Sequence, residues 1–168
     1  MDDVEGFAEE IKRADVLLIN NETPIEVNER AVEIAKSNGV KVILNPAPTR
    51  AHTKEFLDKI DLFTPNEHEL DGLTTKQNLI VTLGEKGCWI KSTDERLPAT
   101  KIENVVDTTG AGDTFNGVLA ACLAEGEGVP TACEKANVAA AMKVGRKYIL
   151  NSIPTREEIE SYMERKNG

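Results

Sequence analysis

A stretch in the second half of the chain, Asp107-Thr-Thr-Gly-Ala-Gly-Asp113-Thr-Phe115, combines two glycines with two carboxylates. The apolar spacing that follows predicts a helix from residue 113 to about 125, so the glycines lie where the first amides of a helix lack partners. Such amides, at the positive end of the helix dipole, bind anions such as phosphate. A carboxylate at Asp113 beside a bound phosphate can accept the proton of an attacking hydroxyl. The alternative is that Asp113 only stabilises the start of the helix.

Two other phosphate-binding motifs are excluded by the residues themselves. No G-x-x-x-x-G-K-[ST] occurs, which excludes a Walker-type NTPase. A G-x-G-x-x-G motif starting at Gly110 fails because Phe115 occupies the position of the last glycine.

The composition predicts one compact cytoplasmic domain over residues 1–168. The chain has 168 residues, 40% of them hydrophobic, and a net charge of -9. This acidic balance argues against a nucleic-acid partner and against an anionic membrane surface, since both need clustered Lys and Arg. The sequence has neither a secretory signal nor an apolar run long enough to cross a membrane. Its three cysteines lack a CxxC spacing and are expected to be small buried side chains.

Strand and helix patterns alternate along the chain. Strands are expected at residues 14–20, 40–45, 61–66 and 78–84, and helices at residues 24–37, 54–59, 113–125, 130–147 and 154–165. Capping boxes are expected at Thr23 with Glu26 and at Thr155 with Glu158. This alternation predicts an α/β fold with a doubly wound, mostly parallel sheet and flanking helices.

One connection is too short for that pattern. Residues 67–77 join two expected parallel strands, whereas a complete crossover with its helix takes at least about 10–12 residues. Either the two strands are not adjacent, or a segment has been lost here.

Five segments together resemble the ribokinase-like, or PfkB, family of carbohydrate kinases, and the ribokinase branch most of all. They occur in the family's order, from about residue 14 to the end of the chain: NPAP at 45–48, TPNEHEL at 64–70, VTLGEKG at 81–87, DTTGAGDTFNGVLAA at 107–121 and PTREEI at 154–159.

The resemblance implies an ATP-dependent phosphotransferase that acts on a sugar hydroxyl. Asp113 would be the base, and three amides would hold the transferred phosphoryl group: those of Gly110, Ala111 and Gly112. Asn66 and Glu69 would place Mg²⁺ and the phosphates, with Glu69 acting through a metal-bound water.

The resemblance also implies contacts with the nucleotide and the sugar. Thr82, Gly84 and Gly87 match a loop that runs along the nucleotide, and Asn137 matches a residue near the adenine. Glu22 matches a position that touches the sugar, although it could equally be an acidic residue in the first turn of a helix.

A monovalent-cation site is implied around Asp107, Thr109 and Ser152, where the family binds K⁺. The opposite side of this site departs from the family, because Tyr148 stands where a glycine is common. The sequence therefore leaves potassium activation open.

The resemblance covers only the C-terminal part of the family. Counterparts of the first strands, the small β-sheet lid and most sugar-binding groups are absent, so the chain alone is expected to turn over weakly or not at all. Three hypotheses follow: a sugar kinase that retains ATP binding, an inactive or engineered nucleotide-binding fragment, and a structural subunit completed by another chain. The shortened sheet is also expected to expose an edge strand that favours a homodimer.

Overall fold

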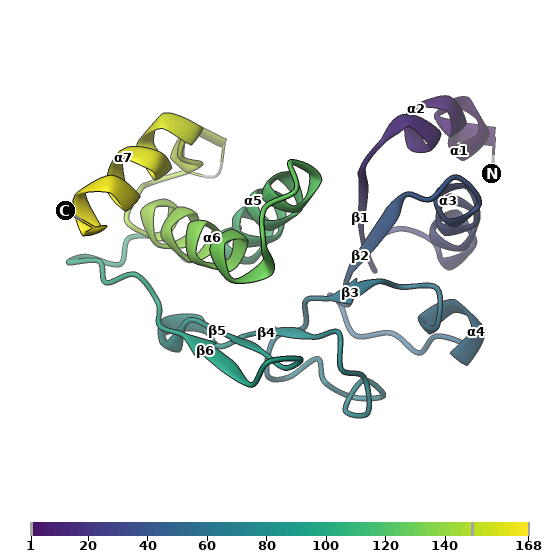
Figure 1. The fold of residues 1–168 in the computed structure, drawn as a ribbon, viewed down its shortest axis with the longest axis horizontal. Helices are drawn as coiled ribbons and strands as arrows, with labels where there is room; N and C mark the ends of the chain where they lie inside the picture. The colour runs from purple at the N-terminus through teal and green to yellow at the C-terminus, as the bar shows by residue number, and fades with distance from the viewer. Residues whose placement is uncertain (1, 149, 168) are drawn as a thin grey trace. The chain divides into compact units, whose positions relative to one another are not determined.

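The structure, a computed structural model, describes residues 2–148 and 150–167 (Figure 1). These residues form two compact units. The first unit holds the described residues up to Val81 together with Lys91–Thr93, and the second holds Thr82–Ile90 and the described residues from Asp94 onward. That residues 1–168 form a single domain stays a prediction.

The first unit is built on a parallel sheet in the order β1-β2-β3. Strand β1 spans Val16–Asn20, β2 spans Lys41–Asn45 and β3 spans Leu62–Phe63. Helix α3, Ile25–Ser37, connects β1 to β2, and the short α4, Lys54–Leu57, precedes β3. The predicted α/β fold with a parallel sheet and flanking helices is thus confirmed.

The central strand β2 carries the core of this unit. Val42, Ile43 and Leu44 are fully buried in succession, as expected for a strand covered on both faces. Its register with β1 is continuous, from Val16 opposite Lys41 to Asn20 opposite Asn45.

Two short helices at the N-terminus were not predicted. They are α1, Asp2–Gly6, and α2, Ala8–Arg13, and Figure 1 shows both beside α3. An apolar cluster of Val4, Ala31 and Ile34 joins α1 to α3. Strand β1 is an outer strand of the sheet, Leu18 in it is 37% exposed, and homodimerisation through this edge stays a prediction.

The short connection after β3 contains turns and no helix in the structure. Phe63 nevertheless pairs in parallel with Leu79, and its N–H donates to the Asn78 carbonyl at 2.9 Å. The Asn78 amide in turn donates to the carbonyls of Ile60 and Asp61. The two segments are therefore adjacent, although β3 and the following β4, Ile80–Thr82, are shorter than expected.

The second unit combines a small antiparallel ribbon with three helices. A 3-10 turn, η1 (Gly84–Lys86), precedes the paired strands β5 (Cys88–Ile90) and β6 (Glu95–Leu97). The helices are α5 (Ala111–Ala124), α6 (Val129–Val144) and α7 (Arg156–Asn167), with a 3-10 turn, η2 (Leu150–Ser152), before α7. Val138 and Ala139 of α6 pack on Ile159 of α7. All three cysteines are buried, as predicted.

One of the two predicted capping boxes is present. The Thr155 N–H donates to the Glu158 carboxylate at 2.9 Å, and the Glu158 N–H donates to the Thr155 hydroxyl at 3.3 Å. The box at Thr23 and Glu26 is wrong, because α3 begins after Pro24 with no side-chain cap. Instead, the Thr23 hydroxyl donates to Asn28 at 2.7 Å.

We expect Ile43→Ala to lower the free energy of unfolding by about 2–5 kcal/mol, because it opens a cavity in a fully buried strand. Lys41→Ala in the same strand removes an exposed side chain and should stay within about 0.5 kcal/mol of the parent. Urea denaturation followed by circular dichroism measures both. Equal midpoints for the two variants would contradict this account of the core.

Candidate active site

The start of α5 is shaped by the backbone of Gly110. This residue has φ 76°, in the left-handed region that glycine tolerates, and it is the N-cap of the helix. The Gly110 carbonyl accepts from both the N–H (2.9 Å) and the hydroxyl (2.8 Å) of Thr114. The helix begins at Ala111, two residues earlier than expected, so Gly112 and Asp113 both lie in its first turn.

Two backbone amides of this first turn are available to a ligand. Among the described residues, the N–H groups of Gly112 and Asp113 have no acceptor, whereas the Ala111 N–H donates to the Thr108 carbonyl at 3.2 Å. Of the three amides expected to hold a phosphoryl group, the one at Ala111 is thus occupied within the chain. The Asp113 N–H, which the sequence interpretation had not included, is free in its place.

The side chains of this turn leave room for a ligand. A Cβ added at Gly112 would meet nothing within 4 Å, so the packing of the chain does not require a glycine there. The Asp113 carboxylate is exposed and makes no hydrogen bond or ion pair within the described chain. It does not cap the helix, which leaves it available to act on a bound group.

The predicted cation ligands lie just before this turn and after α6. The Asp107 carboxylate accepts the N–H of Thr109 at 2.9 Å. This hydrogen bond and, to a lesser extent, the charge of Lys143 lower the pKa of Asp107 below its ordinary value. Ser152 is fully buried in η2. Tyr148, which the resemblance placed where a glycine is common, is exposed and has φ 68°, in the left-handed region that non-glycine residues rarely adopt.

The loop expected to follow the nucleotide is a tight turn. The Leu83 N–H donates to the Gly87 carbonyl at 2.8 Å, and the Gly87 N–H donates to the Gly84 carbonyl at 3.1 Å. Both glycines have positive φ, 56° at Gly84 and 94° at Gly87. A Cβ at Gly87 would lie 2.0 Å from the Leu97 carbonyl oxygen, while a Cβ at Gly84 would meet nothing within 4 Å. Gly87 is therefore required by the fold itself. Thr82 is the last residue of β4, at the entrance to this turn.

Asn137 faces the interior of the second unit. Its side chain is 8% exposed, and its amide donates to the buried Cys88 thiol at 3.6 Å. The amide group is thus engaged within the protein, and contact with adenine stays a prediction.

In the first unit, Asn66 and Glu69 are joined by two hydrogen bonds. The Glu69 carboxylate accepts from the backbone N–H of Asn66 at 3.0 Å and from its side-chain amide at 2.7 Å. Each carboxylate oxygen retains lone pairs, which fits an interaction with a metal-bound water. The described residues contain no cluster of three or more His, Cys, Asp or Glu that could hold a metal directly. Glu22 is exposed after β1, and its N–H donates to the Asn20 side chain at 3.0 Å.

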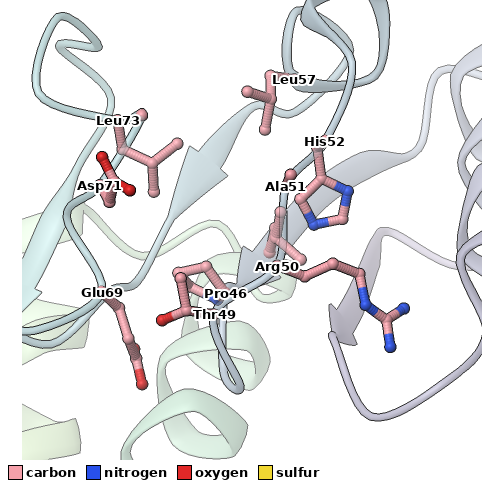
Figure 2. A pocket seen from close by; sticks show the side chains of 11 residues that line it. Pro46, Thr49, Arg50, Ala51, His52, Leu57, Glu69, Asp71 and Leu73 are labelled. Atoms are coloured by element: carbon pink, nitrogen blue, oxygen red, sulfur yellow. The ribbon is translucent and has the colours of Figure 1, made fainter.

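A cavity of about 240 Å³ lies beside the Asn66–Glu69 turn, entirely within the first unit. Figure 2 shows Asp71 and Leu73 on one side of it and Ala51 and His52 on the other, while Glu69 extends away from Asp71 and Leu73. The His52 ring stacks on Phe56 and lies 2.9 Å from the Asn21 side-chain oxygen. Burial lowers the pKa of His52, which favours its neutral form. These contacts give His52 a structural role.

Comparison with known proteins identifies the family. The chain matches the pfkB family of carbohydrate kinases over residues 2–156. It is 36% identical to a ribokinase from Haemophilus influenzae, an alignment that covers 92% of this chain and 58% of the relative. The chain belongs to the pfkB family of carbohydrate kinases.

Solved structures of the family agree with the fold. A ribokinase from Thermotoga maritima matches with a TM-score of 0.81 and 32% identity, over 94% of this chain and 59% of that protein. A ribokinase from Arabidopsis thaliana, solved with ribose and ATP, matches with a TM-score of 0.85 and 28% identity, over 97% of this chain and 59% of that protein.

The chain therefore spans a little under three fifths of the length of these family members. The alignment with the Haemophilus protein extends over 176 residues, more than the 168 of this chain. That relative therefore has internal residues without a counterpart here, consistent with the short connection after β3. Within the described part of the chain, no helix combines the length and the apolar character needed to span a bilayer.

One residue beside the predicted site was missed by sequence reasoning. Lys143 of α6 is fully buried, and its ammonium nitrogen lies 3.0 Å from the Asp107 carbonyl oxygen. The sequence did contain a signal, since Lys143 is a single charge within the apolar run Ala139–Val144. A buried charge requires a partner, and the sequence alone does not show which one.

We expect Gly87→Ala to destabilise the protein by about 3 kcal/mol, the upper end of the usual cost of overpacking, because its methyl group would collide with the Leu97 carbonyl. Gly84→Ala meets no atom and should cost about 1 kcal/mol, from its positive φ alone. Urea denaturation of both variants measures the difference. If the two variants were equally stable, the close approach at Gly87 would not exist.

Proposed function

We propose that this chain is the nucleotide-binding part of a sugar kinase and that it binds the terminal phosphate of ATP at the start of α5. The observation that carries the proposal is the first turn of α5. There a left-handed glycine lies within four consecutive residues, Gly110 to Asp113, with two N–H groups and a carboxylate that have no partner in the described part of the chain.

The charges of this turn suit phosphoryl transfer. The N–H groups of Gly112 and Asp113, together with the helix dipole, stabilise the negative charge of the transferred group. The Asp113 carboxylate accepts the proton of the sugar hydroxyl as the hydroxyl oxygen bonds to the γ-phosphorus. The bond from the γ-phosphorus to the bridging oxygen then breaks, and ADP leaves with the electron pair.

Magnesium fits the chemistry of the Asn66–Glu69 pair. Bound Mg²⁺ would neutralise part of the phosphate charge, and Glu69 would orient a water of its hydration shell. Asn66 holds the Glu69 carboxylate through two hydrogen bonds, so it would act as a positioning residue.

The similar proteins support the proposed ligands more strongly than they support turnover by this chain alone. The Arabidopsis ribokinase in complex with ribose and ATP supports ATP and a small sugar as the ligands. Because the chain spans 59% of that protein, turnover by this chain alone is a separate matter from nucleotide binding. Glu22, exposed after β1, is proposed as a contact to the sugar.

We call residues Gly110 to Asp113, where the phosphate is proposed to bind, the phosphate cradle. Two glycines of α5 test this proposal. A methyl group at Gly112 would enter the space proposed for phosphate, so Gly112→Ala should weaken binding of Mg·ATP at least about tenfold, or 1.4 kcal/mol. Gly117→Ala also meets no atom within 4 Å but lies further along α5, and it should bind like the parent. Isothermal titration calorimetry measures both, with thermal unfolding to confirm that each variant is folded. Equal affinities in the two variants would place the phosphate elsewhere.

The role of Asp113 is tested by Asp113→Asn. Removing the base should lower phosphoryl transfer by about 10²–10⁴-fold while Mg·ATP binding stays within a few-fold. Coupled detection of ADP release, with ribose as the acceptor, measures the rate, and Glu103→Gln is the control at an exposed acidic residue. If the parent chain binds ATP but no sugar raises its ADP release above that of Asp113→Asn, the chain alone is a nucleotide-binding module without turnover.

A further inference from the structure

Lys143 is an unusual residue for the position it occupies. It lies near the C-terminal end of α6, and its side chain is 0% exposed. Burial of an unpaired ammonium group is costly, so its partners reveal what it is there to hold. Its partners among the described residues both belong to Asp107: the ammonium nitrogen lies 3.0 Å from the main-chain carbonyl oxygen and 3.8 Å from Oδ2 of the carboxylate.

Asp107 in turn fixes the segment that leads into α5. Its backbone N–H donates to the Val144 carbonyl at 3.1 Å, and its Oδ1 accepts the Thr109 N–H at 2.9 Å. The Thr108 carbonyl then accepts the Ala111 N–H at 3.2 Å. Three hydrogen bonds, joined through the backbone of residues 107–109, therefore connect the buried ammonium to the turn at Gly110.

A monovalent cation at Asp107 does not fit beside this ammonium group. Two positive charges about 4 Å apart repel by roughly 4 kcal/mol at the effective dielectric constant of a protein surface. An ammonium group and a potassium ion carry the same charge, have similar radii and are both bound by carbonyl and carboxylate oxygens. A main-chain and a carboxylate oxygen of Asp107 already face the Lys143 ammonium.

We propose that the Lys143 ammonium replaces the monovalent cation that the resemblance implied, so that the turn before α5 is held without potassium. Lys143 is then a positioning residue, which acts on the phosphate cradle through Asp107. The role of this turn in binding phosphate rests on the proposed function. The replacement of the cation by Lys143 does not, and it can be measured without nucleotide.

The test uses hydrogen–deuterium exchange of the amides of residues 107–113, in KCl and in tetramethylammonium chloride at equal ionic strength. In the parent chain the exchange rates should be the same in both salts. Lys143→Met keeps the apolar stem and removes a hydrogen bond from a charged group, so exchange should accelerate by about 10–100-fold. Lys147→Met replaces an exposed lysine just after α6 and makes the same change in net charge. The amides of residues 107–113 should exchange in this variant as they do in the parent.

Rescue by potassium separates replacement of a cation from simple packing. Lys143→Ala opens space beside Asp107, and potassium should slow exchange in this variant while tetramethylammonium, which is too large, should not. Absence of that rescue in the folded variant would reduce Lys143 to a packing residue and overturn the proposal.

The parent chain provides a decisive result even if neither Lys143 variant folds. Slower exchange of residues 107–113, or a higher thermal midpoint, in potassium than in tetramethylammonium would show that a cation still binds, which would overturn the proposal. Equal values in the two salts would support it. The exchange experiment contains no ATP, so its outcome does not depend on nucleotide binding. If the chain failed to bind ATP, the proposed function would be wrong, but the conclusion about Lys143 and potassium would stand.

Discussion

The structure of the candidate site depends on backbone amides that the chain does not satisfy. A helix always begins with N–H groups that have no intrahelical acceptor, and most proteins cover them with a side-chain cap. Helix α5 begins at a glycine that has no side chain to offer, and the nearby Asp113 does not fold back to cap it. The positive end of the helix is left open to an anion, beside a carboxylate that is free to accept a proton.

Holding such a turn in place requires contacts from elsewhere in the second unit. The end of α6 supplies them through the Val144 carbonyl, which accepts the N–H of Asp107, and through the Lys143 ammonium. An unpaired amide is useful only if its direction is fixed before the ligand arrives, because the ordering would otherwise reduce the binding energy. In this chain, the buried Lys143 ammonium contacts the residue that leads into the turn, so the charge that holds it is carried by the protein itself.

The glycines of the site are required for different physical reasons. At Gly87 a side chain would collide with a carbonyl oxygen, and at Gly110 the backbone is left-handed. Gly112 has neither constraint within the chain, which agrees with the ligand approach proposed for this turn. Gly84 has the positive φ but open space around it. Sequence motifs record all four residues alike, although only the surroundings show which of them serves the fold.

The sequence by itself determined the α/β class, the presence of the strand over residues 40–45 and the glycine-containing turn before α5. Each of these depends on local periodicity, on glycine and on residues adjacent in the chain. Tertiary structure decided the rest. It showed that Thr23 bonds to Asn28 instead of capping α3, that a connection made only of turns joins Phe63 to Leu79, and that Lys143 meets Asp107. These contacts could not be read from the sequence because their energies depend on burial and on partners distant along the chain, which exist only once the chain has folded.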